Sequence, residues 1–244
     1  LFWIVHNGQK YTGMPGWPAP EREDEVWPVV AFLQELPTME AGSYAMLAGT
    51  SQAPAVAIGL GREQDADIIE GCGRCHGGPG ERPISDLVPS LSGQKADYLR
   101  RALHEYRDGR RQSGMMQLLA ADLSDKEIDE VSRVYSAAPA TSLGMAGDAE
   151  QRQRGEAIVT EGLPAAGVPS CLGCHSGNRR ADFPVLAGLS ARYVALQLGL
   201  WQEGLRDGTA AGAIMSRIAL RLSAEDIDSV AAYLQSLTPE GGAR

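Results

Sequence analysis

The sequence is poor in cysteine, in basic residues and in long apolar runs, and each shortage excludes a class of protein. All four cysteines of the 244-residue chain lie in two short motifs, so none is left for a disulfide or a free catalytic thiol. The net charge of −9 argues against nucleic acid or an anionic membrane surface as a partner. No apolar run reaches the roughly 20 residues that a membrane-spanning helix needs. Residues 1–5 lack the basic flank and cleavage site of a signal peptide, so no leader or membrane anchor is visible.

One five-residue pattern, Cys-x-x-Cys-His, occurs twice, at residues 72–76 and 171–175. The pattern is typical of covalent attachment of a c-type haem. Two thiols on one helical turn add to the vinyl groups of one porphyrin, and the histidine lies beneath the iron as an axial ligand. Structural zinc normally has a fourth ligand close by, which these motifs lack. We therefore predict two haem c groups held by Cys72, Cys75, His76, Cys171, Cys174 and His175.

The two motifs belong to an internal repeat. Cys72 and Cys171 are 99 residues apart, and so are Met116 and Met215. Each methionine therefore follows the histidine of its motif by 40 residues. A thioether on the far face of the iron is typical of an electron-transfer haem. Met116 and Met215 are thus predicted to be the second axial ligands.

Two other side chains near the first motif compete with this ligand set. Met115 is adjacent to Met116 but falls outside the register of the repeat, so we expect it to pack in the interior, as flexible thioethers often do. In the middle of the repeat the copies are offset by 95 residues, as Pro89 is from Pro184, and His104 there has Gly199 as its counterpart in the second copy. A ligand present in only one of two like sites is not expected, although histidine is a common metal ligand.

The scaffold around each motif is predicted to be helical, which makes the fold class all-α. Apolar residues recur at helical spacing after each motif. The last helix of each copy is expected to begin with a capping box, at Ser124 and at Ser223. A short helix is expected at residues 65–70, and a longer one at residues 150–161 that ends at Gly162.

Taken together, these motifs resemble those of class I c-type cytochromes, specifically the tandem diheme cytochromes of bacterial periplasms, over about residues 62–240. The resemblance implies two small helical bundles, each around one covalent haem, and a periplasmic location, because this family acquires its haem outside the bacterial cytoplasm. It also implies thioether bonds at the four cysteines, proximal ligation by the two histidines and distal ligation by the two methionines. In such proteins the proline of a Pro-x-Leu-x-Gly element commonly offers its carbonyl to the proximal imidazole. That role falls to Pro89 and Pro184.

The first residues carry a further methionine motif. Residues 13–17 read Gly-Met-Pro-Gly-Trp and precede an acidic helix start at residues 23–25 and an apolar helix. This order resembles the C-terminal half of another class I domain whose Cys-x-x-Cys-His half is missing. We expect a third, truncated haem domain in which Met14 is the distal ligand of a third haem. The alternative is a haem-free extension that packs onto the first complete domain through Trp17, Trp27 and Phe32.

The repeat and the linker-like composition between its copies predict the domain boundaries. Residues 1–48 are assigned to the C-terminal part of a cytochrome c-like domain and residues 49–62 to a linker. The haem domains span residues 63–140, called the first copy below, and residues 149–240, called the second copy. Residues 141–148 join them.

The predicted ligands fill both axial positions of each iron, which leaves no site for a substrate and favours outer-sphere electron transfer over enzymatic catalysis. We therefore predict a periplasmic multihaem cytochrome that transfers electrons between a dehydrogenase or quinol-oxidising complex and a terminal acceptor. Its partners are redox proteins and not nucleic acid. One alternative is a diheme cytochrome c peroxidase, which needs an open iron, and another is a fixed electron-transfer subunit of a larger dehydrogenase complex.

Overall fold

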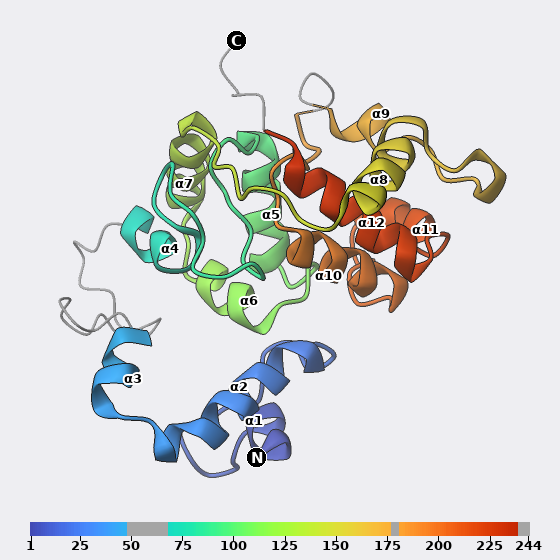
Figure 1. Cartoon of the computed structure of the whole chain (residues 1–244). Coiled ribbons are helices and arrows are strands. Elements are labelled where there is room, and N and C mark those ends of the chain that lie inside the picture. Colours follow the sequence, from blue (N-terminus) through green and yellow to red (C-terminus); the bar gives the residue numbers. More distant parts are fainter. Residues whose placement is uncertain (48–67, 177–180, 239–244) are drawn as a thin grey trace. The chain divides into compact units, whose positions relative to one another are not determined.

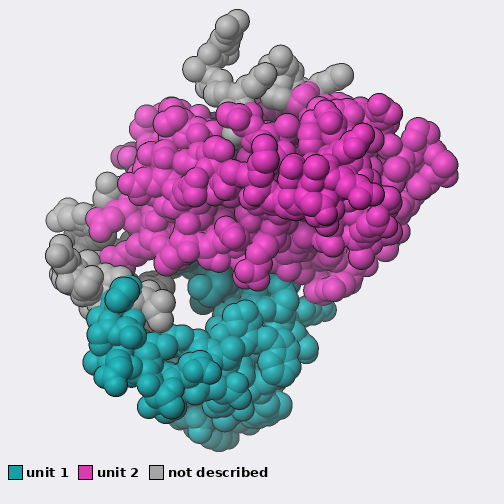
Figure 2. Space-filling view, viewed as in Figure 1, with its two compact units in different colours: residues 1–65, 106–122 teal, residues 66–105, 123–244 magenta. Residues whose placement is uncertain are grey.

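The computed structural model describes residues 1–47, 68–176 and 181–238, and its regular elements within those ranges are helices without a β-strand. This confirms the predicted all-α class. Contacts divide the chain into a first unit, residues 1–65 and 106–122, and a second unit, residues 66–105 and 123–244 (Figure 2). None of the described helices is both long and apolar enough to cross a membrane. The predicted linker at residues 49–62 lies outside the described residues, and the predicted domain boundaries stay a prediction.

The first unit contains α1 (Phe2–Asn7), α2 (Glu23–Glu35), the 3-10 helix η1 (Leu36–Thr38), α3 (Ala41–Leu47) and α6 (Gly114–Ala121). Three acidic residues occupy the first turn of α2, where negative side chains stabilise the positive end of the helix dipole. Helices α1 and α2 pack together, and their buried core consists of Val5, Val26 and Val30. The helix expected after the acidic residues is thus present as α2, and its apolar face is buried against α1.

The second unit contains α4 (Ile68–His76), α5 (Ala96–Arg107) apart from its last two residues, α7 (Asp125–Ala137), α8 (Ala149–Glu161), the 3-10 helix η2 (Pro164–Ala166), α9 (Leu172–His175), α10 (Ala191–Gln202), α11 (Ala210–Ala219) and α12 (Ala224–Ser236). Helix α8 packs along α12, α10 packs on both α11 and α12, and α4 packs on α7 (Figure 1). A Cβ atom at Gly155 would overlap the backbone carbonyl of Ser229, so glycine permits the close approach of α8 to α12.

Two apolar clusters form the interior of the second unit. The larger cluster is contributed by the second copy and includes Ile158, Val194, Val230 and Leu234. The smaller one belongs to the first copy and is built on Leu99, Val131 and Tyr135. Each copy thus has its own apolar core, and the Cys-x-x-Cys-His motif of that copy packs against it.

Local signals in the sequence predicted the helix ends well. Ser124 and Ser223 both form complete capping boxes, with the side chain of the third helical residue returning to the cap. Helix α8 begins one residue before the predicted start and ends at Gly162, whose φ of 84° lies in the left-handed region that favours glycine. The short helix expected at residues 65–70 appears as α4 from Ile68 onward, while residues 65–67 lie outside the described part of the chain.

Candidate haem sites

The first motif lies at the C-terminal end of α4. Cys72 is half-buried against the apolar cluster of the first copy, whereas Cys75 is exposed, and neither forms a disulfide. His76 ends the helix, and its Nδ1–H donates to the carbonyl oxygen of Pro89 over 2.8 Å. Because a carbonyl only accepts, Nδ1 carries the proton and the lone pair of Nε2 remains for a metal.

The second motif has the same arrangement around the short helix α9. Cys171 precedes the helix and packs against the large apolar cluster, while Cys174 is exposed and neither forms a disulfide. The Nδ1–H of His175 donates to the carbonyl oxygen of Pro184 over 3.0 Å. The structure therefore brings each motif histidine together with the proline named for it from the sequence. A carbonyl partner on one ring nitrogen fixes the orientation of a ligating imidazole.

Burial is the main cause of the pKa shifts at His76, His175 and Cys171. It lowers the pKa of His76, against the opposing effect of the bond to Pro89. Burial also lowers the pKa of His175, with the bond to Pro184 acting the other way and the charge of Lys95 lowering it further. The thiol of Cys171 has its pKa raised to about 11 by burial. A neutral imidazole suits ligation of haem iron.

The loop that contains the Pro-x-Leu-x-Gly element, residues 89–95 in the first copy and 184–190 in the second, is called the proximal loop of its copy. Each proximal loop is hydrogen-bonded to the last helix of its copy. Gly93 and Gly188 both adopt a φ of 76° in the left-handed region. The amide of Gly93 donates to the carbonyl of Tyr135 over 3.0 Å, and the amide of Gly188 donates to that of Leu234 over 2.8 Å. The same backbone geometry is therefore built twice.

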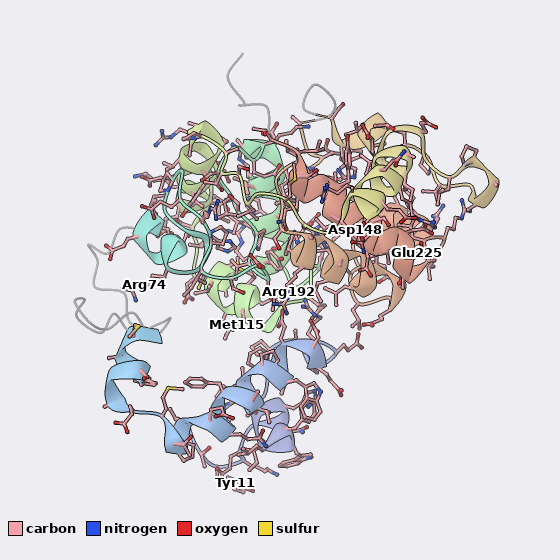
Figure 3. The ribbon with its side chains drawn as sticks, viewed as in Figure 1. Tyr11, Arg74, Met115, Asp148, Arg192 and Glu225 are labelled. Atoms are coloured by element: carbon pink, nitrogen blue, oxygen red, sulfur yellow. The ribbon has the colours of Figure 1, made fainter. Side chains whose placement is uncertain are left out.

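The predicted methionine ligands lie in the two units. Met215, on α11, is half-buried against the large cluster that Cys171 also contacts, so one apolar core holds both predicted sides of the second site. Met116, on α6 of the first unit, is half-buried too. Met115 is 54% exposed (Figure 3), so the expectation that it packs in the interior is wrong. Met14 lies in the loop between α1 and α2 and is 39% exposed.

These donor sets fit a covalently attached haem. Each motif offers two cysteines outside any disulfide and a half-buried imidazole with one nitrogen available. Among the described residues, no three histidine, cysteine or acidic side chains converge into a site for a bare metal ion. The chemistry therefore matches thioether attachment with a single histidine ligand from each motif.

Polar side chains that sequence reasoning missed join the two copies within the second unit. The amide of Gln94 pairs with the backbone of Val185, donating through Nε2 over 3.0 Å and accepting through Oε1 over 2.7 Å. Lys95 Nζ donates to the carbonyl oxygen of Ser176 over 3.3 Å, next to His175. Arg101 donates to the carbonyl of Asp182 over 2.6 Å. The proximal loops of the two haem sites are thus bonded to each other.

The Cytochrome c family profile matches residues 153–238. Cytochrome c4 of Pseudomonas aeruginosa is 39% identical over 170 residues, which are 68% of this chain and 83% of the relative. A thiosulfate dehydrogenase electron acceptor of Stutzerimonas stutzeri is 33% identical over 68% of this chain and 78% of its own. The solved cytochrome c4 of Acidithiobacillus ferrooxidans superposes with a TM-score of 0.62 at 31% identity, covering 69% of this chain and 99% of that one.

The repeated helical fold and paired motifs define a c-type cytochrome with tandem haem domains. The chain belongs to the diheme class I c-type cytochromes, the family of cytochrome c4. It carries two covalently attached haem c groups and functions in electron transfer with redox proteins.

Proposed function

We propose that this protein carries electrons in the periplasm from a dehydrogenase or a quinol-oxidising complex to a terminal acceptor. The observation that carries the proposal is the double pairing of Gln94 with Val185, which bonds one proximal loop to the other. An electron relay needs two redox sites at a fixed distance and orientation. The hydrogen bonds between the two copies support such a fixed arrangement. The relative named as an electron acceptor of thiosulfate dehydrogenase supports a dehydrogenase as the donor.

In this mechanism the residues of the chain hold and orient the redox groups. Cys72 and Cys75 would attach the first haem, and Cys171 and Cys174 the second. His76 and His175 would provide the proximal nitrogens, with Pro89 and Pro184 fixing their ring orientation. Met116 and Met215 would provide the distal thioethers. When bound, each haem supplies an iron that gains or loses a single electron while the covalent structure of the protein stays the same.

Rapid-mixing kinetics with the purified oxidised protein and a candidate donor test the carrier role. We expect both haems to be reduced by a dehydrogenase without a stable complex between the two proteins. Co-purification with a flavin, quinone or molybdenum protein would instead support a fixed subunit. Recovery of the protein from the cytoplasmic fraction of the native cell would contradict the periplasmic location.

A peroxidase role is the second candidate function, and we propose that the protein lacks it. Peroxide must reach an open iron, whereas the equal spacing of Met116 and Met215 from the motif histidines supports a filled distal position in both copies. Peroxide turnover by the purified protein, or a high-spin ferric signal in its electron paramagnetic resonance spectrum, would contradict this.

We also propose that residues 1–48 form the C-terminal part of a third cytochrome domain with Met14 as a haem ligand. Its support is the order of elements, in which α1 precedes a methionine loop and packs on the following helix α2, as α10 precedes Met215 and packs on α12. The mass of the denatured native protein tests it. Three haem masses on a chain that continues N-terminal to Leu1 support the third domain, and two on a chain that begins at Leu1 leave a haem-free extension.

A further inference from the structure

The carboxylate of Glu25, in the first turn of α2, lies at the start of α6, the helix that carries Met116, and both helices belong to the first unit. Glu25 Oε2 accepts from the amide of Gly114 over 2.6 Å, and Oε1 accepts from the hydroxyl of Ser113 over 2.7 Å. The indole N–H of Trp17 also donates to Oε2, over 3.2 Å. The Glu25 side chain is only 15% exposed. A buried carboxylate at a helix N-terminus, with several donors, is stabilised by the helix dipole and by strong hydrogen bonds.

A buried arginine completes this contact. Arg22 is 6% exposed and donates to the carbonyl oxygen of Gln112 over 2.6 Å, two residues before α6 begins. It also pairs with Asp24 over 2.7 Å and with Glu25 over 3.0 Å. Burial opposes its charge, but the hydrogen bond to Asp24 and the charges of the two acids outweigh burial and raise its pKa. The segment before α6 is therefore held by an ion-pair network around the buried guanidinium of Arg22.

Ser113 connects this network to the backbone of the methionine. Its hydroxyl donates to Glu25 and accepts from the amide of Met116 over 3.3 Å, so Glu25 fixes the orientation of the hydroxyl that caps Met116. The second copy lacks this connection, because Gly212 stands at the position equivalent to Ser113. There Thr209 caps α11 and accepts from the amide of Gly212 over 2.9 Å.

We propose that Glu25 is a positioning residue for the distal ligand of the first haem, acting through Ser113 on the helix turn that carries Met116. Residues 1–47 would then stabilise methionine ligation in the first copy alone. The inference rests on the proposed role of Met116. It holds whether or not these residues belong to a third haem domain.

Displacement of the methionine by imidazole in the ferric holoprotein tests this role. Glu25→Gln keeps the size of the side chain but removes its charge and one acceptor oxygen. We expect imidazole to bind the first haem about tenfold more tightly, since the loss of one charged hydrogen bond of roughly 1.4 kcal/mol is a factor of ten. The affinity of the second haem should not change. Glu23→Gln is the matched control, because Glu23 lies on the same turn but is exposed, and it should leave both affinities unchanged.

Variants at Ser113 and at the methionines separate the possible outcomes. Ser113→Ala should reproduce the effect of Glu25→Gln, and Ser113→Thr, which keeps the hydroxyl, should restore the original affinity. Met116→Ala and Met215→Ala assign the two binding phases. If Met116→Ala alters the imidazole affinity of neither haem, Met116 is not a ligand and the proposed ligand is wrong.

If Met116→Ala alters the imidazole affinity of one haem but Glu25→Gln does not, in protein whose far-ultraviolet circular dichroism is normal, the positioning role alone is overturned.

Discussion

The two copies hold their motif histidines in the same way but begin their methionine helices differently. On the proximal side, both imidazoles donate to a proline carbonyl and both following glycines have a φ of 76°. On the distal side, each methionine helix is capped by a residue of its own copy, Thr209 for α11 and Ser113 for α6. Only for Ser113 does the described part of the chain also show a hydrogen bond to a residue outside the copy, Glu25, 88 residues earlier in the chain. The hydrogen-bonded setting of the motif histidine is therefore the same in both copies, while the setting of each predicted distal ligand differs.

The largest effect should come from removing one attachment site. Replacing Cys171 and Cys174 together by alanine would remove both predicted thioethers of the second copy and leave those predicted for the first. We expect the mass of the denatured protein to fall by one haem out of two. The matching change at Cys72 and Cys75 should give the same loss, since the two motifs have like geometry. Retention of both haem masses in either variant would contradict independent attachment.

The next largest effect should come from the helix crossing of the second copy. Gly155→Ala places a Cβ against the backbone carbonyl of Ser229, where the neighbouring helix cannot shift easily. We expect a loss of about 1–3 kcal/mol in the free energy of unfolding, as for other overpacked sites. Chemical denaturation followed by far-ultraviolet circular dichroism measures it. Gly199→Ala, on α10 and outside the haem motif, is the control and should cost far less, because no atom of a neighbouring element lies within 4 Å of the added Cβ.

The interface between the copies should contribute a smaller amount. Gln94→Ala removes two hydrogen bonds to the backbone of Val185 and leaves that partly buried amide and carbonyl without this partner. We expect a loss of about 0.5–1.5 kcal/mol in the free energy of unfolding and a broader unfolding transition, because the copies become less strongly coupled. Gln153→Ala, at an exposed position on α8, should leave the transition unchanged. Unaltered cooperativity in Gln94→Ala would mean that other contacts couple the copies.

The smallest effect should come from Lys95, which brings a charge of the first copy close to His175 of the second. Lys95→Met removes that positive charge, which disfavours the ferric state, so the reduction potential of the second haem should fall. Charge interactions at partly exposed sites of about 0.2–1 kcal/mol correspond to roughly 10–40 mV for a one-electron couple. Spectroelectrochemistry should find the first potential nearly unchanged. An equal fall in both potentials would show that the charge acts generally and not across the interface.

The sequence predicted those features that depend on a few neighbouring residues or on the repeat. The capping boxes at Ser124 and Ser223 each depend on only four consecutive residues, and Gly162, with its left-handed φ, ends α8 as expected. The motif spacing identified the haem family. Long-range polar contacts were not predictable, because a side chain such as Gln94 has no periodic signal and its counterpart in the second copy is Leu189.

The bond from Glu25 to Ser113 escaped prediction for a related reason. An acid in the first turn of α2 is explained locally by the helix dipole, so the sequence gives no sign of a distant partner. The exposure of Met115 was mispredicted because adjacent positions on a helix face different directions, and its register alone does not reveal which direction is buried.

The ligand set of the two haems is the central claim, and near-infrared magnetic circular dichroism of the ferric protein tests it most directly, because the method distinguishes a thioether from a second nitrogen or an open position. We predict methionine ligation at both haems attached to this chain. Met116→Ala should remove one methionine signal and Met215→Ala the other. A signal from two nitrogen ligands or from high-spin iron at either haem of the unaltered protein would contradict the account.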